Sequence, residues 1–336
     1  MSREILYIGN NLSNKTKYPT TMEALSRLLS KQKYNIYKTS SKQNKFLRLF
    51  EMCFSILKHR RKIDYILIDT YSTHNFYFAF LTSQIARIYK IKYIPILHGG
   101  NLPSRLKQSP KLSNLIFKNS YLNIAPSNYL KYKFEEKGYS VKLVPNIIEI
   151  KAYKYKLRDS LNPKLLWVRS FKNIYNPTLA IEVLKLLKKN FPSAILCMVG
   201  PENDDSFNKT KTLVKKYNLE SSVEFTGVLT KKEWHKKSEY FDIFINTTNF
   251  DNTPVSVIEA MALGLPVVST NVGGMPYLIN NKVDGILVDS NNAKLMSKAI
   301  LKILEDNFTD LAINARKKVE SYDWDIVKNL WKEILK

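Results

Sequence analysis

Two carboxylates that could act on one ligand, Asp251 and Glu259, stand with seven residues between them. They belong to the segment 251–274, whose sequence is DNTPVSVIEAMALGLPVVSTNVGG. The letters VSVIEAMAL have the apolar spacing of a helix, and the first backbone amides of a helix lack intrahelical partners and favour an anion. The segment therefore predicts a helix start whose amides can bind an anionic ligand. Two acids lie beside this helix start. An ordinary capped helix, with Asp251 as a solvated loop acid, is the alternative.

The residues around this helix predict how its ends are formed. Asn252 and Thr253 can cap the helix that Pro254 opens, because a proline needs no amide partner at that position. Gly264 ends the helix, and LPVVST is typical of a buried parallel strand. Gly273 then begins a glycine pair at which backbone can approach a ligand closely. Strand ends and a helix start are thus predicted to meet here.

The same segment resembles the C-terminal core of family 4 glycosyltransferases. Their pattern is Glu, seven residues, Glu, Ala-Met, then Gly-(Leu/Ile)-Pro-Val-(Val/Ile) and Gly-Gly, and here Asp251 takes the place of the first Glu. In that family the second acid accepts hydrogen bonds from the nucleotide ribose, and the first lies beside the donor sugar. The resemblance implies these roles for Glu259 and for Asp251, which is one methylene shorter than the usual Glu. It also implies a nucleotide-diphosphate sugar as donor and a metal-independent reaction that retains anomeric configuration.

A cation is predicted beside the donor diphosphate. Arg169 ends the segment KLLWVRS, where the resembled family carries an arginine that contacts the diphosphate. Guanidinium groups suit phosphate oxygens and stabilise charge that develops on a leaving group. The family normally adds a lysine about five residues later, but Ile174 stands at that spacing, and Lys172 is the nearest substitute. The other residues assigned to the donor are Gly200, Asn252, Thr253, Pro254 and Gly273.

Histidine and glycine residues follow the predicted strands of the first half. His98 comes after KYIPIL, so we expect it at the carboxyl tip of a strand, where imidazole can bind a sugar hydroxyl or exchange a proton. A histidine near the donor sugar recurs in the resembled family, although a lone histidine is more often structural. His59 and His235 lie in lysine-rich runs and are expected at the surface. The residues predicted on the acceptor side are Gly9, His74, Gly99, Gly100, Asn101 and Arg105.

Length and composition indicate a soluble protein of two domains. The chain has 336 residues, 44% of them hydrophobic and 24% charged. Its start, MSREILYIGN, is unlike a signal peptide, and no apolar run reaches membrane-spanning length, so we expect a cytoplasmic protein. Cys53 and Cys197 lack metal-ligand spacing, and neither a cofactor nor a metal is expected. The acids of Asp323-Trp324-Asp325 open the last helix, where they favour its dipole rather than a metal.

Short apolar strands alternate with helical segments throughout, which is typical of parallel sheets with helices on both faces. The first set of strands is EILYIG, YNIYKT, DYILID, KYIPIL, YLNIA and VKLVP. The second set is KLLWVRS, AILCMVG, SVEFTG, DIFINT, LPVVST and GILVD. A polar stretch from Glu149 to Asn162 is typical of a linker.

This pattern predicts an α/β protein of two doubly wound, Rossmann-like domains that face one another across a cleft, and the resemblance implies that the fold is GT-B, with a closing helix that crosses back onto the first domain. We place an N-terminal acceptor-binding domain at residues 1–150, with a C-terminal helix at 322–336 that crosses back onto it. We place the nucleotide-sugar-binding domain at residues 151–321.

The formal net charge of +24 is concentrated in the first half. Residues 1–150 hold 25 Lys and Arg against 8 Asp and Glu, a net charge of +17. No acid lies between Asp69 and Glu135, so this region should attract anionic partners. Nucleic acid is disfavoured, because no helix-turn-helix, zinc-finger or RNA-binding aromatic pattern accompanies the charge. An anionic membrane surface is the other candidate, and it would make the protein peripheral on the inner face of the membrane.

The segment KQNKFLRLFEMCFSILKHRRK allows two interpretations. It carries apolar residues at helical spacing, namely Phe46, Leu49, Phe50, Cys53, Phe54 and Leu57. Together with the basic residues around them, these could form an amphipathic helix that lies on lipid. The stripe could instead be the core face of a helix that covers the sheet.

Residues and resemblance together predict a glycosyltransferase of the hexosyltransferase type, acting on a glycan or lipid-linked acceptor in cell-surface polysaccharide or glycolipid synthesis. A UDP-sugar epimerase of the same fold would share the nucleotide half. It would need several acids beside a histidine, and the acid-free stretch from Thr70 to Phe134 argues against it. A non-catalytic protein that binds anionic ligands would explain the positive charge alone. Donor, acceptor and oligomeric state stay open at this level.

Overall fold

The computed structural model describes residues 3–9, 11, 20–306 and 309–336. The chain divides into two compact units. Unit 1 comprises Met1–Ile147 and Trp324–Lys336, and unit 2 comprises Ile148–Asp323. Every strand pairing within the two main sheets is parallel, as the alternating pattern of the sequence predicts.

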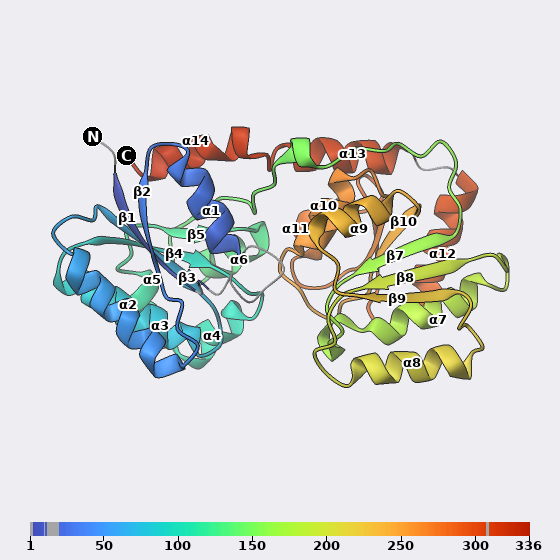
Figure 1. Cartoon of the computed structure of the whole chain (residues 1–336), viewed down its shortest axis with the longest axis horizontal. Coiled ribbons are helices and arrows are strands. Elements are labelled where there is room, and N and C mark those ends of the chain that lie inside the picture. Colours follow the sequence, from blue (N-terminus) through green and yellow to red (C-terminus); the bar gives the residue numbers. More distant parts are fainter. Residues whose placement is uncertain (1–2, 10, 12–19, 307–308) are drawn as a thin grey trace. The chain divides into compact units, whose positions relative to one another are not determined.

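The described residues of unit 1 form a six-stranded sheet in the order β2-β1-β3-β4-β5-β6 (Figure 1). Its strands are β1 (Glu4–Ile8), β2 (Asn35–Thr39), β3 (Tyr65–Thr70), β4 (Lys92–Leu97), β5 (Asn123–Ala125) and β6 (Val141–Leu143). Its helices are α1 (Thr21–Ser30), α2 (Lys45–His59), α3 (Asn75–Ile88), α4 (Leu102–Gln108), α5 (Pro110–Phe117), α6 (Asn128–Glu135) and α14 (Trp324–Ile334).

Both faces of this sheet are buried under helices, which explains the continuous apolar runs of its central strands. Along β1, Tyr7 packs on one face with Trp331 of α14 and with α1, while Leu6 packs on the other face with Met52 of α2 and with α3. Side chains alternate between the two faces because a strand has a period of two residues. The C-terminal helix α14 thus belongs to the core of unit 1.

Unit 2 repeats this plan with the strand order β12-β11-β10-β7-β8-β9 among its described residues. Its strands are β7 (Lys164–Val168), β8 (Ile195–Val199), β9 (Val223–Gly227), β10 (Ile243–Asn246), β11 (Val267–Thr270) and β12 (Ile286–Val288). Its helices are α7 (Pro177–Leu187), α8 (Ser206–Lys216), α9 (Lys231–Ser238), α10 (Val255–Ala262), α11 (Met275–Leu278), α12 (Ala293–Asp306) and α13 (Thr309–Glu320).

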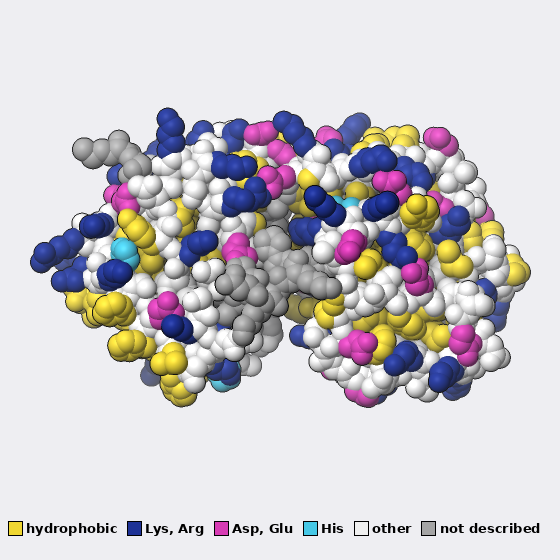
Figure 2. All heavy atoms as spheres, in the orientation of Figure 1, with side chains coloured by type: hydrophobic (Ala, Val, Ile, Leu, Met, Phe, Trp, Pro, Cys, Tyr) yellow, Lys and Arg dark blue, Asp and Glu magenta, His cyan; other side chains and the backbone are white. Residues whose placement is uncertain are grey.

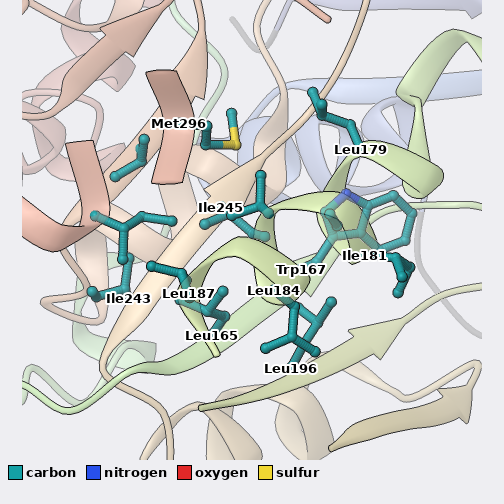
Figure 3. Close-up of a cluster of buried hydrophobic side chains, with 14 of the residues drawn as sticks. Leu165, Trp167, Leu179, Ile181, Leu184, Leu187, Leu196, Ile243, Ile245 and Met296 are labelled. Atoms are coloured by element: carbon teal, nitrogen blue, oxygen red, sulfur yellow. The ribbon is translucent and has the colours of Figure 1, made fainter. Parts of the chain in front are cut away.

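One hydrophobic cluster of unit 2 joins the sheet to α7, α8 and α12. Figure 3 shows Trp167 of β7 among side chains of α7, with Ile245 of β10 and Met296 of α12 in the same cluster. Trp167 is buried, and its Nε1–H donates to Thr247 Oγ1 at 2.9 Å, so the polar atom of the indole is satisfied. The opposite face of the sheet packs against α9, α10, α11 and α13.

The segment Glu149–Asn162 is not the linker that its polarity predicts. The buried guanidinium of Arg158 donates to the carbonyl oxygens of Phe241, Lys156, Gly264 and Ser238 at 2.8–2.9 Å. Because these carbonyls satisfy its polar head, Arg158 can lie inside unit 2 and hold the segment against it. Asp323 fixes the start of the same segment, since its Oδ2 accepts the Ile150 N–H at 2.7 Å.

Of the two interpretations of the α2 stripe, the core-face one is wrong for its phenylalanines, whereas Leu49 packs against the core of unit 1. The buried residues of α2 are Arg48, Met52 and Ile56, whereas Phe46 and Phe50 are 84% and 72% exposed. The two sets lie on different sides of the helix, and the sequence alone could not say which side meets the sheet. Over the part of the chain that is described, no helix is long and apolar enough to cross a membrane.

Candidate functional site

The carboxyl edge of the unit 2 sheet brings Arg169 and Asp251 together. The strand order reverses at β7, which lies between β10 and β8. In doubly wound sheets, ligands bind beyond the carboxyl ends of the strands at such a reversal. Arg169 directly follows β7, and Asp251 lies in the loop after β10. Both residues therefore lie where the topology itself predicts a ligand.

Arg169 and Asp251 form an ion pair between Nη2 and Oδ2. The other carboxylate oxygen, Oδ1, accepts the Asn252 N–H at 2.8 Å. The guanidinium carbon of Arg169 lies 4.2 Å from the centre of the Tyr175 ring, which supports one face of the cation. Arg169 Nε is buried and has no hydrogen-bond partner among the described residues. The pair is thus held in place, and the Nε–H of the cation is buried without a partner in the described part of the chain.

The start of α10 differs from the capped helix that the sequence predicts. The helix begins at Val255, Pro254 is its N-cap, and no side chain caps it. The predicted capping by Asn252 and Thr253 is therefore wrong. Thr253 Oγ1 and Ser256 Oγ are both buried without a hydrogen-bond partner in the described structure. The first turn of α10 consequently presents uncapped amides and two unpartnered hydroxyls beside the Arg169–Asp251 pair, a set of donors suited to an anion.

Glycines let the loops around this pair meet at backbone contact. A Cβ on Gly200, which follows β8, would lie 1.8 Å from the Arg169 carbonyl oxygen. A Cβ on Gly273 would lie 2.1 Å from the Asp251 carbonyl oxygen, and one on Gly274 would lie 1.7 Å from the Asn252 carbonyl oxygen. The close approach that these glycines permit is therefore to neighbouring backbone, and it fixes the loops that carry Arg169 and Asp251.

Glu259 lies on α10 in a buried polar cluster. Its Oε1 accepts the Tyr153 hydroxyl at 2.9 Å and lies 2.6 Å from Lys231 Nζ. His235 Nε2 is 3.9 Å from Oε2. Burial alone would raise the pKa of Glu259, but the neighbouring His235 ring and Lys231 ammonium more than offset it and lower that pKa. Glu259 is thus an ionised acceptor inside a buried polar cluster.

Three members of this cluster were not predicted. Lys231 and His235 occupy the first and second turns of α9, and the expectation that His235 is a surface residue is wrong, because its side chain is only 14% exposed. The spacing of four residues on a helix was a usable signal, since it places both side chains on one face. Tyr153 lies in the segment predicted as a linker, and its ring is tilted by 43° against the His235 ring with centres 4.8 Å apart. No spacing in the sequence pointed to this contact.

Lys172 is exposed in the loop that precedes the 3-10 turn Asn173–Tyr175. The carbonyl oxygen of Ile174 accepts the Asn249 N–H at 2.8 Å, which ties this turn to the loop after β10. The replacement of the missing lysine by Lys172 stays a prediction.

A second polar cluster lies at the carboxyl edge of the unit 1 sheet. His98 is buried, and its Nε2 is 2.8 Å from Asp69 Oδ1. The same oxygen accepts the Tyr7 hydroxyl at 2.9 Å, and the Tyr71 ring stacks on His98 at 5.1 Å. Gly9 leaves room for this acid, because a Cβ there would lie 2.5 Å from Asp69 Oδ2. His98 is therefore oriented by a carboxylate that the sequence did not connect with it.

This pairing changes one earlier inference. The absence of acids from Thr70 to Phe134 argued against an epimerase, yet Asp69 at the end of β3 lies beside His98 at the end of β4. Residues on adjacent parallel strands meet across the sheet although they are far apart in sequence. The acid-free stretch consequently says little about the surroundings of His98.

Of the remaining residues predicted on the acceptor side, Arg105 has a structural contact of its own. Arg105 donates through Nε and Nη2 to the Ser72 carbonyl oxygen at 2.9 and 2.6 Å, which fixes the loop before α3. Asn101 precedes α4 without a side-chain capping bond, and His74 is exposed before α3. Gly99 is exposed at φ +89°, next to Gly100, which is partly buried. Asn10, next to Gly9, lies outside the described residues.

Across the described ranges, no group of three or more His, Cys, Asp or Glu side chains could hold a metal ion.

Residues 153–322, just over half of the chain, match the family described as glycosyl transferases group 1, so the chain belongs to this family. Over 271 residues it is 26% identical to the amylovoran biosynthesis glycosyltransferase AmsK of Erwinia amylovora. That alignment covers 75% of this chain and 66% of AmsK. A second relative, 21% identical over 208 residues, is the UDP-Gal:alpha-D-GlcNAc-diphosphoundecaprenol alpha-1,3-galactosyltransferase of Escherichia coli, with 56% of this chain and 52% of that protein aligned.

The chain thus spans two thirds or less of the length of these curated relatives. Among solved structures, HepE of Anabaena in complex with UDP-glucose aligns with a TM-score of 0.76 over 99% of both chains. The two sequences are 16% identical, so this likeness shows the fold alone. The fold is GT-B, built from two doubly wound units, as the sequence predicts.

Proposed function

We propose that this chain is a retaining, metal-independent family 4 glycosyltransferase that moves a sugar from a nucleotide-diphosphate sugar to an acceptor hydroxyl. The observation that carries the proposal is the Arg169–Asp251 pair beside the uncapped start of α10. A guanidinium, free amides and two hydroxyls are what a diphosphate requires, and an acid next to them can accept hydrogen bonds from a sugar. Membership of the glycosyl transferases group 1 family supports this assignment.

In the proposed reaction, the bond between the sugar anomeric carbon and the diphosphate oxygen breaks, and a new bond to the acceptor oxygen forms on the same face of the sugar. The acceptor proton passes to the departing diphosphate. Negative charge grows on that diphosphate in the transition state, so the guanidinium of Arg169 and the amides of α10 stabilise it most at that stage. His98, held by Asp69, is proposed to bind a sugar hydroxyl.

Glu259 is proposed to bind the nucleotide ribose. It is ionised and buried on the same helix as the proposed diphosphate site, and ribose hydroxyls would replace the hydrogen bonds that Tyr153 and Lys231 now make. The complex of HepE with UDP-glucose supports a nucleotide sugar as ligand for this fold.

The proposed acceptor is a glycan or a lipid-linked saccharide. Support comes from the names of two relatives, one acting in amylovoran biosynthesis and the other on a sugar linked to diphosphoundecaprenol. A cytoplasmic enzyme working at the inner face of the membrane would fit such an acceptor and the +17 charge of residues 1–150.

A panel of UDP-, GDP-, ADP- and dTDP-sugars tests the reaction class. Purified protein should slowly release the nucleoside diphosphate from one donor, detected by chromatography, with the free sugar as the second product. An epimerised donor would instead identify an epimerase, and an unchanged panel that still binds would identify a non-catalytic protein. Hydrolysis should persist in excess chelator, and its loss there would contradict the metal-independent mechanism.

Arg169→Ala should lower turnover about a hundredfold or more, because the charge that Arg169 meets grows in the transition state. Binding of the nucleoside without phosphates should hardly change. Lys189→Ala, which removes an exposed cation after α7, is the matched control and should keep full turnover. Equal losses in turnover and nucleoside binding would assign Arg169 to general binding instead.

A further inference from the structure

The outer side of α2 carries a row of exposed phenylalanines. Phe46, Phe50 and Phe54 are 84%, 72% and 54% exposed, and their spacing of four residues puts them on one face of the helix. The rings of Phe50 and Phe54 stack with centres 6.4 Å apart. Met52 and Ile56 on the inner side are buried in the core of unit 1, so the helix is anchored while this row remains uncovered.

A second apolar row lies on α3, which covers the same face of the sheet as α2. Tyr77, Leu81 and Ile88 are 44%, 40% and 73% exposed. The ends of the two helices meet, since the guanidinium of Arg60 after α2 lies 5.6 Å from the ring centre of Tyr89 after α3. We call these six residues the α2–α3 face: Phe46, Phe50, Phe54, Tyr77, Leu81 and Ile88. Figure 2 shows hydrophobic side chains gathered over α2 and α3 at the lower left.

The surroundings of the α2–α3 face are basic. The exposed cations next to it in sequence are Lys42, Lys45, Lys58, Arg60, Arg61, Lys62, Arg87, Lys90 and Lys92. The one acid in the sequence of α2, Glu51, is hydrogen-bonded to the Ser40 hydroxyl, and the sequence of α3 has none. Asp69, the next acid along the chain after Asp64, is buried against His98. Apolar side chains are thus bordered by cations with little opposing charge.

A hollow near the end of α3 adds a place for an anionic group. It has a volume of about 340 Å³ and is lined by Arg87, Lys90, Lys92 and Tyr121 among others, with no acid in its lining. Lys92 Nζ lies 4.7 Å from the centre of the Tyr121 ring, so the ammonium is held toward this space. Cations in an open hollow beside exposed apolar residues match the phosphate groups of lipids.

We propose that the α2–α3 face docks on an anionic lipid bilayer. The aromatic and aliphatic side chains enter the headgroup region, and the flanking lysines and arginines meet lipid phosphates. Charge favours this partner over a second copy of the chain, because a symmetric contact would bring two identical basic borders together. The inference does not depend on the proposed reaction, since none of these residues belongs to the candidate site.

Vesicle sedimentation tests the proposal on the whole chain. The wild-type protein should sediment with vesicles that contain phosphatidylglycerol and remain in solution with phosphatidylcholine alone. Binding should weaken as salt rises from about 0.01 M to about 1 M, because the screening length falls from about 30 Å to about 3 Å. The triple variant Phe46→Ser, Phe50→Ser, Phe54→Ser should bind at least about tenfold more weakly, and these exposed positions leave the core intact.

A matched variant, Tyr240→Ser with Val283→Ser, removes two apolar side chains of unit 2 that are 68% and 52% exposed, and it should bind like the wild type. Lys58→Glu with Arg61→Glu should also weaken binding while the phenylalanines remain. The proposal is overturned if the wild type ignores anionic vesicles at low salt, or if the phenylalanine variant binds as well as the matched one. A concentration-dependent dimer in light scattering that the phenylalanine variant abolishes would instead assign the face to a second copy.

Discussion

At the scale of single residues, Arg169 and Asp251 were assigned separate roles but form one ion pair. The sequence assigns the cation to a diphosphate and the acid to a sugar, but the side chains bind each other. A partly buried ion pair with a supporting ring holds a guanidinium in one orientation. The side chain therefore loses less conformational entropy when a ligand binds. In the proposed site, a bound diphosphate would therefore share Arg169 with Asp251, which would keep the cation aligned.

The residues that sequence reasoning missed contact the predicted site residues in the fold but lie far from them in the sequence. Asp69 and His98 are 29 positions apart and meet because β3 and β4 are adjacent. Tyr153, Lys231 and Glu259 come from three separate segments. A motif identifies residues that are close in the chain, so it located Glu259 but could not identify the groups that keep it ionised.

Glu259 carries the prediction at this scale. If it binds ribose, Glu259→Ala should lose roughly 1.5 to 3 kcal/mol of nucleotide affinity, because hydrogen bonds to a charged acceptor are worth about that much. The dissociation constant of the nucleoside diphosphate, measured by calorimetry, should therefore rise roughly tenfold to hundredfold. Glu305→Gln, at an exposed acid on α12, should leave it unchanged. Unaltered affinity in a folded Glu259→Ala protein would place the ribose site elsewhere.

At the scale of elements, the strands and helices α2 and α10 were predicted, but the core side of α2 and the start of α10 were not. Strands buried on both faces become continuous apolar runs, and every predicted run matches one of the strands in the described part of the chain. The core side of α2 could not be predicted, because apolar residues occupy two of its sides and periodicity could not select between them. The predicted capping of α10 was wrong because Pro254 takes the N-cap position. The Asp251 carboxylate accepts the Asn252 amide outside the helix.

The glycine loop beside α10 can be tested with a pair of substitutions. Gly274 has φ −86°, which suits alanine, but its Cβ would lie 1.7 Å from the Asn252 carbonyl oxygen. Because backbone must then move, Gly274→Ala should destabilise unit 2 by about 3 kcal/mol or more and weaken nucleoside diphosphate binding. Calorimetric unfolding and a binding titration measure the two effects.

Gly227 supplies the opposite case, because its φ is +66° and nothing lies within 4 Å of a Cβ there. Gly227→Ala should cost only about 1 to 2 kcal/mol, from backbone strain, and leave binding unchanged. If both variants lost stability equally and bound equally well, close contact between the two loops would not be what positions Asp251.

At the scale of the whole molecule, charge is the property that the sequence predicts most directly. A net charge of +24, with +17 in residues 1–150, sets like charges against one another in the folded state. Ion pairs oppose this effect, and Lys142–Glu333 at 2.7 Å, between β6 and α14, is an example in unit 1. Exposed pairs contribute about 0–1 kcal/mol each, and the few acids of this region limit their number. Repulsion should therefore dominate.

Salt should accordingly stabilise unit 1. Raising ionic strength from about 0.01 M to about 0.15 M shortens the screening length from about 30 Å to about 8 Å, which weakens repulsion across the unit. We expect a gain of about 1 kcal/mol, or roughly 2–4 °C in the midpoint of its calorimetric transition. Lys107→Glu with Lys111→Glu, at exposed positions on α4 and α5, should raise the midpoint at low salt and reduce the response to added salt. A midpoint that falls with salt would mean that ion pairs such as Lys142–Glu333 outweigh the repulsion.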